Sequence, residues 1–398
     1  MNKTIQFPEP REDRLPDPKV TAPKDKVTLD QRGMIDMPFL VITILLLIVG
    51  LVMMFSASYA SAYAAKATGY KPTYYFARQG IFAAVGVGLM LATALIVNYE
   101  WLRIFAFPIL LVTSALMLLT PIIGLTGGGA TRWISLGAFS FQPSEIAKIT
   151  IIVCFANIIS YYKDKMLNLK NMRPFILVWG FMVLTLLFQR HLSGIIIITC
   201  VSVAMVFMGG IPVKWILVPA IVGVVGLAIY LGVMDYAADR IMAWRDPWSV
   251  ARDEGYQIVQ SLLAIGSGGL MGLGLGRSRQ KYLYLPEEHN DYIFPVVCEE
   301  LGFVGAVAII LLFMLLILRG YWIAMHAKDR FGALLAGGIS TLLALQVFFN
   351  IGVVTNFLPA TGISLPFFSY GGTALVIQLV EMGLVLSVSR QSNNQLLI

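Results

Sequence analysis

The residues best suited to chemistry gather between positions 277 and 294, next to a long apolar run. Three cations come first, and three carboxylates and a histidine follow: Arg277, Arg279, Lys281, Glu287, Glu288, His289 and Asp291. Cationic side chains bind phosphate oxygens, and a carboxylate can accept a proton from a hydroxyl group. Asp291 directly precedes an apolar helix start, so partial removal from water should make it a better base. A solvated loop that ends in a helix-capping aspartate fits the same residues equally well.

A second candidate opens another apolar run, at residues 142–148. Pro143 and Ser144 are typical of a helix start. Glu145 and Lys148 are three residues apart, so they share one face of that helix. The pair is therefore either a structural ion pair or part of a polar cavity that binds a ligand.

Further polar residues lie within or between apolar runs. Glu299 and Glu300 stand about two turns into the helix that follows Asp291. Adjacent helical positions point in different directions, so we expect these carboxylates not to share one cavity. His191 is expected to be a hydrogen-bonded residue at a junction between two runs. A polar interior is also indicated by Gln346, Asn350 and Glu381.

The elements that position these residues must be membrane helices. The chain has 398 residues, 58% of them apolar and 13% charged, and its mean hydropathy is +0.78. Soluble domains carry about 25% charged residues. The apolar surface must therefore face lipid, and the sequence predicts an all-α polytopic membrane protein.

Ten apolar runs of near-spanning length predict about ten transmembrane helices. They lie at about 39–55, 77–97, 103–121, 145–161, 174–189, 192–210, 214–233, 294–318, 332–354 and 368–389. Basic residues concentrate in alternate loops and at the C-terminal end, which predicts that both termini are cytoplasmic. The expected organisation is a disordered tail at 1–36, a membrane domain at 37–390 and a short tail at 391–398.

This topology places three longer segments outside, at 58–76, 122–144 and 234–293. The third, between the seventh and eighth helices, holds a large share of the charges. Its part at 258–275 is apolar and rich in glycine, so we expect it to pack against the bundle or to re-enter the membrane. A long charged loop between spans is more often functional than merely connecting.

Several classes of function are not supported by the sequence. The three cysteines, Cys154, Cys200 and Cys298, have no CxxC or Cys/His spacing, which predicts free buried thiols. No nucleotide-binding loop, haem motif or HExxH zinc motif is present. The pI of about 9.2 reflects basic residues in short loops, which set topology and do not indicate a nucleic acid partner.

Four groups of motifs follow one another along the chain. They are Trp133, Ile134 and Gly137 with 141–145 and Lys148; 255–257 with 264–270 and 272–274; 285–287 with 290–294 and 299–302; and 361–363 with 365–367 and 369–372. Taken together, they resemble the RodA/FtsW family of shape, elongation, division and sporulation (SEDS) proteins. The resemblance covers residues 37–390. The FtsW-like branch is the expected one, although the motifs do not separate division from elongation or sporulation.

The resemblance implies a ten-helix peptidoglycan glycosyltransferase that polymerises lipid II at the outer face of the cytoplasmic membrane. The family's essential loop aspartate matches Asp291, and its helix-borne acid and base match Glu145 and Lys148. Near the aspartate this chain has Asn290 and Tyr292 where the family often has Thr and Phe, and these keep polarity and aromaticity.

One further departure concerns the junction after the fifth helix. Many family members have a Pro-Asp pair there, and this chain has Arg190 and His191. No acid is therefore expected to act at this junction.

The implied reaction displaces undecaprenyl pyrophosphate from a donor sugar by an acceptor hydroxyl, which needs a base and positive charge. Asp291 is the expected base. The expected substrate-binding residues are Glu145, Lys148, Arg132, Trp133, Arg240, Arg277, Lys281, Glu300 and Ser369. The sequence assigns no cofactor; a divalent cation such as Mg²⁺ or Mn²⁺, with Asp291 as a candidate ligand, would help the pyrophosphate leave. A nucleophilic carboxylate that forms a glycosyl-enzyme remains an alternative.

The resemblance also implies partners. These are lipid II, membrane lipids, a class B penicillin-binding protein that crosslinks the glycan, and divisome or elongasome proteins. A lipid II flippase would suit the helices and buried charges as well, but no internal repeat supports a transporter. A scaffold that only recruits the transpeptidase would leave Asp291, Glu145 and Lys148 without a purpose.

Overall fold

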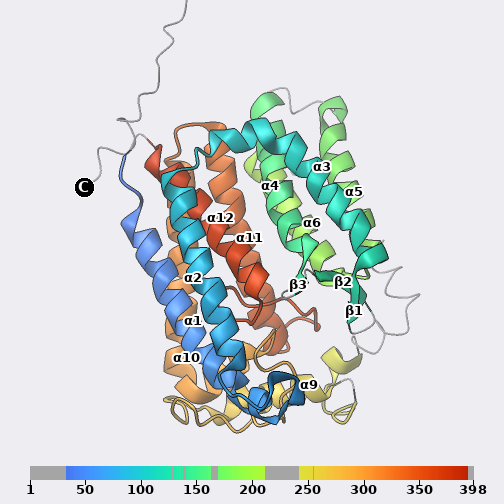
Figure 1. Ribbon diagram of the computed structural model, residues 1–398, viewed down its shortest axis with the longest axis vertical. Helices are drawn as coiled ribbons and strands as arrows, with labels where there is room; N and C mark the ends of the chain where they lie inside the picture. The colour runs from blue at the N-terminus through green and yellow to red at the C-terminus, as the bar shows by residue number, and fades with distance from the viewer. Residues whose placement is uncertain are drawn as a thin grey trace, which may run out of the picture. The chain divides into compact units, whose positions relative to one another are not determined.

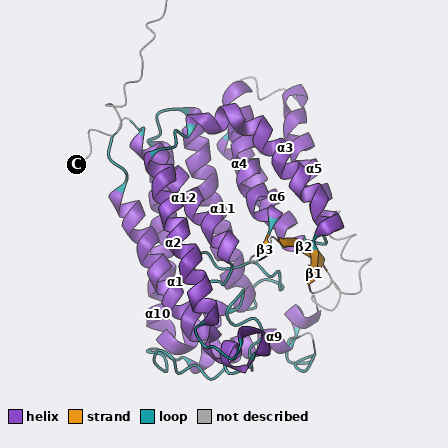
Figure 2. Ribbon diagram, in the orientation of Figure 1, coloured by secondary structure: helices purple, strands orange, loops and turns teal. Residues whose placement is uncertain are grey.

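The computed structural model describes residues 33–127, 130–135, 137, 140–162, 169–210, 242–253 and 255–392. Figures 1 and 2 show that these residues are mainly long helices lying side by side, with one small sheet. The helices are α1 (Met37–Ala64), α2 (Tyr74–Leu95), α3 (Glu100–Ile123), α4 (Pro143–Tyr162), α5 (Leu169–Phe188), α6 (Leu192–Met208), α9 (Tyr256–Ser267), α10 (Ile293–Met325), α11 (Arg330–Val354) and α12 (Gly372–Arg390), with a short 3-10 helix at Lys66–Thr68. The strands are β1 (Leu125–Gly127), β2 (Ala130–Ser135) and β3 (Ser140–Phe141).

Most of the predicted spans coincide with these helices. Seven of the described helices are long and apolar enough to cross a membrane, namely α1, α2, α3, α4, α10, α11 and α12. Two shorter apolar helices lie at Met172–Phe188 and Leu192–Met208, where the fifth and sixth spans were predicted. The predicted span at 214–233, the adjoining 234–241, the first 32 residues and 393–398 lie outside the described residues.

Helices α4 and α11 form the interior of the bundle. They are the most buried of the candidate spans, and α11 packs against α10, α4, α6 and α12. Glycine permits this close approach, because a Cβ on Gly338 would lie 2.6 Å from atoms of both Ile152 and Met205. Polar residues that begin or lie within these two helices are therefore held in a tightly packed setting.

Two boundaries differ from the sequence prediction. Helix α1 continues to Ala64, so the external segment expected from residue 58 begins later; alanine and serine continue the helix without strain. The segment 122–144, expected as a loop, contains a three-stranded antiparallel sheet in the order β1-β2-β3. Its strands are only two to six residues long, too short for a periodic pattern to reveal.

The expectation that 258–275 packs against the bundle is confirmed. Helix α9 packs on α10 and α11, and the Ser261 hydroxyl donates to the carbonyl of Val354 at 2.6 Å. Figure 1 shows α9 at the same end of the bundle as the loop between α1 and α2. This end also holds the start of α10, and with it Asp291.

Candidate active site

At the start of α4, Glu145 and Lys148 form the ion pair that their spacing predicts. The Lys148 Nζ lies 2.6 Å from the Glu145 Oε2, and the side chains are 10% and 16% exposed. In the described part of the chain, Lys148 Nζ contacts no other acceptor. An amine has three N–H groups, so this cation keeps donors for a ligand.

Two side chains from distant parts of the sequence lie close enough to interact electrostatically with this pair. Glu381 of α12, which is buried, feels the charges of both Lys148 and Glu145. His191, directly before α6, lies with its Nε2 3.5 Å from the Gln142 Nε2. Burial, and then the positive charges of Arg132 and Lys148, lower the pKa of His191 to about 3. His191 is therefore neutral near pH 7.

The small sheet positions Arg132 and Trp133. Both residues are on β2, where Trp133 pairs with Leu125 of β1. Arg132 Nη2 donates to the carbonyl of Arg190 at 2.8 Å, which ties the sheet to the junction between α5 and α6. Strand β3 then runs through Gln142 directly into α4, so the sheet brings Arg132 and the Glu145–Lys148 pair to one region.

The second polar region surrounds Asp291, which is half-buried just before α10. Asn350 of α11 donates its Nδ2 to the carbonyl of Asp291 at 2.7 Å and to the carbonyl of Ile363 at 2.8 Å. A Cβ on Gly362, whose φ is +68°, would lie 3.4 Å from the Asp291 Oδ2. The carboxylate thus lies against the backbone of the 361–363 motif, and glycine permits this approach.

Aromatic rings cover the neighbouring loop. The rings of Tyr75 and His289 are 4.6 Å apart, and those of Tyr75 and Tyr370 are 4.9 Å apart. The Tyr370 N–H donates to the His289 carbonyl at 2.8 Å. Burial raises the pKa of Tyr370, so its hydroxyl keeps its proton and remains a donor.

A buried glutamine of α2 holds the start of α12 in place. Gln79 Nε2 donates to the carbonyl of Ser369 at 3.1 Å, and its Oε1 accepts from the Gly371 N–H at 3.2 Å. Two residues further on, the Thr373 hydroxyl donates to the carbonyl of Ser140 on β3 at 3.2 Å. The segment 369–373 therefore connects the Asp291 region with the sheet that leads into α4.

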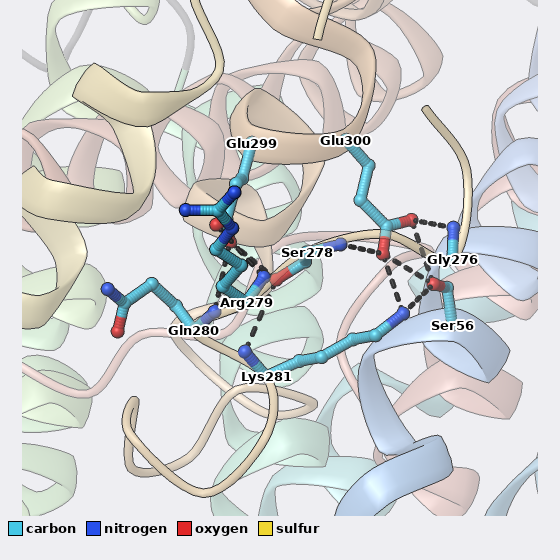
Figure 3. A network of polar contacts seen from close by, with 8 residues as sticks. All are labelled: Ser56, Gly276, Ser278, Arg279, Gln280, Lys281, Glu299 and Glu300. Atoms are coloured by element: carbon cyan, nitrogen blue, oxygen red, sulfur yellow. Dashed lines mark hydrogen bonds and ion pairs between the residues drawn. The ribbon is translucent and has the colours of Figure 1, made fainter. Parts of the chain in front are cut away.

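A third polar cluster joins the loop 276–281 to α10 and α1 (Figure 3). Lys281 Nζ lies 2.8 Å from the Glu300 Oε1 and 2.9 Å from the Ser56 hydroxyl. Glu299 accepts from Ser278 and from the backbone N–H groups of Arg279 and Gln280.

Glu299 and Glu300, which were expected not to face one cavity, have different sets of partners but are held by the same loop. The Ser278 hydroxyl donates to Glu299 while its N–H donates to Glu300 at 3.3 Å, so one loop binds both carboxylates. The segment 269–274, just before this loop, enters α10 where the helix departs from helical geometry at Gly302, and this brings the loop beside both side chains.

Comparison with known proteins identifies the family to which this architecture belongs. The family model described as a cell cycle protein, which covers FtsW, RodA and SpoVE, matches residues 37–394. The chain belongs to this family. The resemblance inferred from the motifs and the polytopic helical fold are both confirmed.

Individual members of the FtsW/RodA/SpoVE family are similar over nearly their whole length. The chain is 40% identical over 357 residues to the probable peptidoglycan glycosyltransferase FtsW of Geobacter sp. (strain M18), which covers 89% of this chain and 96% of the relative. It is 38% identical over 369 residues to stage V sporulation protein E of Bacillus subtilis (strain 168), covering 90% and 97%. A solved chain from a peptidoglycan synthase complex has a TM-score of 0.76 at 25% identity, covering 90% of this chain and 99% of that chain.

The predicted substrate-binding residues differ in where the structure places them. Lys281 is buried and engaged by Glu300, so the structure pairs this predicted pyrophosphate ligand with a carboxylate. Ser369 is also buried, and its hydroxyl accepts from the Leu365 N–H at 2.8 Å. Arg277 is exposed, as a contact to substrate requires. Arg240 lies outside the described residues.

Other residues were missed or left without a role. Gln79 is a polar residue inside a predicted span, which is a signal in the sequence, but it belongs to none of the motifs. In the structure it is fully buried. Asn350 was noted as a polar interior residue, and only the fold shows that it holds Asp291. In the described ranges, no three His, Cys, Asp or Glu side chains gather to hold a metal ion, and the divalent cation stays a prediction.

Proposed function

We propose that this chain polymerises lipid II with Asp291 as the general base. As a member of a family whose curated relatives are named for this activity, the chain is a peptidoglycan glycosyltransferase. The observation that carries the proposal is the position of Asp291. Its half-buried carboxylate lies against Gly362, and its backbone is held by Asn350, where separate family motifs meet.

The environment suits the proposed proton transfer. A carboxylate that is partly removed from water is a stronger base than a free one. Asn350 binds the backbone carbonyl of Asp291 and so fixes the backbone from which the carboxylate would meet an acceptor hydroxyl. The product sugar bond forms as the hydroxyl oxygen attacks the anomeric carbon and the bond to the pyrophosphate oxygen breaks.

Charge for the leaving pyrophosphate would come from the start of α4. Lys148 has spare donors, and Arg132 is held nearby by the sheet. His191 is neutral, so it adds nothing to this positive charge. Positive charge that is already in place when the pyrophosphate departs stabilises the transition state without reorganisation.

The proposed orientation follows from the same reaction. We place the end that carries α9 and Asp291 outside the cell and both termini in the cytoplasm, because positive loop charge lies at the opposite end. An impermeant thiol reagent should label a cysteine introduced at Ser249, which is exposed, in intact cells. A cysteine at the exposed Lys328 should react only after the cells are opened. The reverse pattern would contradict both the orientation and the proposed reaction.

A protein partner is proposed from the similarity to a solved complex. The similar solved chain comes from a peptidoglycan synthase complex that coordinates polymerization and crosslinking. We therefore expect a class B penicillin-binding protein to work with this chain, along with further proteins of the division or elongation machinery. Co-purification of such a transpeptidase with the full chain, and a rise in polymer yield on its addition, would test this expectation.

The decisive experiment is incubation of the purified chain with lipid II in detergent, scored by polymer length. Asp291→Asn should reduce the rate about 10²-fold to 10⁴-fold, as loss of a general base does. Asp253→Asn, which removes an exposed carboxylate from the same external segment, is the matched control and should polymerise normally. Wild-type activity of Asp291→Asn would exclude Asp291 as the base. Movement of lipid II across vesicles without polymer would indicate a flippase instead.

A further inference from the structure

Helix α10 is interrupted one turn after Glu299, and another segment fills the gap. At Gly302, φ is +67° and ψ is −170°, which is not helical. The carbonyls of Glu299 and Glu300 accept from the N–H groups of Leu273 and Gly274 at 2.9 and 3.0 Å. On the other side of the break, the N–H groups at 303 and 304 donate to the carbonyls at 269 and 270. A broken helix in a membrane protein needs such partners, and the segment 269–274 supplies them.

The side chains at the break hold the segment that follows. Glu300 accepts from the Ser56 hydroxyl at 2.8 Å and from the Gly276 N–H at 3.0 Å, in addition to its ion pair with Lys281. The side chains of Lys281 and Glu300 are 2% and 0% exposed. Figure 3 shows Lys281, Glu300 and Ser56 converging, with Ser56 coming from α1. An ion pair that is buried and saturated with hydrogen bonds holds its geometry well.

This ion pair closes the segment that carries the proposed base. Asp291 lies ten residues after Lys281 and nine residues before Glu300. The ion pair joins Lys281 to Glu300. The two stretches of chain that lead to Asp291, the loop 281–291 and the helical turns 291–300, are therefore tied together at their far ends. A separate anchor for Asp291 is the bond from Asn350 to its carbonyl.

We propose that Lys281, Glu300 and Ser56 form a buried clamp that positions Asp291 for proton transfer. The proposal rests on the proposed function, because it gives these residues a role through Asp291 and not by contact with substrate. Lys281 would then be a positioning residue and not a ligand of the pyrophosphate. Misplacement of a reacting group by about 1 Å can cost on the order of 10²-fold in rate.

The test uses the full chain with two variants of the clamp. Glu300→Gln keeps the shape of the side chain and removes its charge, and Ser56→Ala removes only the bridging hydroxyl from α1. Arg252→Met is the matched control, since Arg252 is an exposed cation in the segment between α6 and α10 and lies outside the loop 276–281. The measurements are kcat and KM for lipid II, and amide hydrogen exchange of the peptide 282–292.

A positioning role predicts a specific combination of results. Glu300→Gln should lower kcat on the order of 10²-fold, with KM changed less than about threefold, and should raise exchange in 282–292 at least about tenfold. Ser56→Ala should show the same pattern at about tenfold in kcat, and it carries the test if Glu300→Gln is not recovered folded. Arg252→Met should match the wild type in both measurements.

Other results would overturn the clamp. Folded Glu300→Gln and Ser56→Ala proteins with wild-type kcat and exchange would show that the cluster does not position Asp291. A rise in KM alone, with unchanged exchange, would indicate that Lys281 binds substrate directly. If Asp291→Asn were fully active while exchange still rose in the clamp variants, the proposed role of Asp291 would fail and the closure of the segment would stand.

Discussion

Two Lys–Glu ion pairs in this protein share their chemistry and differ in their surroundings. Glu145 and Lys148 lie one turn apart on α4, keep some exposure and leave part of the amine free. Lys281 and Glu300 come from a loop and a helix, are almost fully buried, and are surrounded by Ser56 and backbone donors. The contrast teaches that hydrogen-bond saturation, and not the presence of a buried charge, separates a structural pair from one that can bind a ligand.

The largest effect is expected where the saturated pair is broken. Lys281→Met should destabilise the fold by about 3–5 kcal/mol, because it leaves the Glu300 carboxylate buried and unpaired. Adding Glu300→Leu should not restore stability, since the N–H groups of Gly276 and Ser278 then lose their acceptor, at about 1–3 kcal/mol each. Thermal unfolding in detergent of Lys281→Met, Glu300→Leu and the double variant measures these changes in stability. Recovery of stability in the double variant would contradict the interpretation of the cluster.

The pair on α4 should respond in the opposite way. Lys148→Met should lower polymerisation about 10²-fold to 10³-fold, as loss of a group that stabilises developing charge does. The double variant Glu145→Gln/Lys148→Met should recover stability, because no unpaired charge remains, and should stay inactive. The control is Glu100→Gln/Arg103→Met, which has the same spacing at an exposed helix start. Full activity of the α4 double variant would show that this pair is only structural.

A smaller effect should follow from the neutral state of His191. The unfolded chain protonates this residue below about pH 6.5, while the folded protein keeps it neutral down to about pH 3. Unfolding therefore takes up a proton in this window, and stability falls as the pH decreases from 6.5 toward 3. His191→Gln should remove up to about 1 kcal/mol of this loss per pH unit. The measurement is the unfolding midpoint of each variant between pH 7 and pH 5, with His326→Gln as the control. If the midpoints of the wild type and His191→Gln changed in parallel with pH, His191 would not be the source of this pH dependence.

The smallest expected effects distinguish two buried serines. Ser278 donates to Glu299 and accepts from the Lys281 N–H at 3.2 Å, so Ser278→Ala should cost about 1–3 kcal/mol. The buried Ser144 hydroxyl has no hydrogen-bond partner in the described part of the protein, so Ser144→Ala should change stability by less than about 0.5 kcal/mol. If this hydroxyl meets substrate, the variant should raise KM. Equal destabilisation by both changes would remove the distinction between the two regions.

The sequence determined the membrane fold and the identity of the main chemical groups. Apolar runs of spanning length leave few alternatives to membrane helices, because the backbone must satisfy its own hydrogen bonds in lipid. The spacing of Glu145 and Lys148 fixed their pairing, since residues three apart meet on any helix. The position of Asp291 before an apolar run allowed either a base or a helix cap, and the resemblance of the motifs identified it as the candidate base. These are local relations, and local relations can be read from one segment at a time.

Only the tertiary structure decided which distant residues meet. The contacts of Asp291 with Asn350 and Gly362, and of Lys281 with Ser56, join segments that are 59 to 225 residues apart. The adjacent acids Glu299 and Glu300 came to share one loop because α10 breaks at Gly302 and a glycine-rich segment enters the break. Helical periodicity predicts the directions of neighbouring side chains only while the helix and its partners are regular. Where the backbone leaves that geometry, packing among remote segments determines the contacts, and no local pattern in the sequence records it.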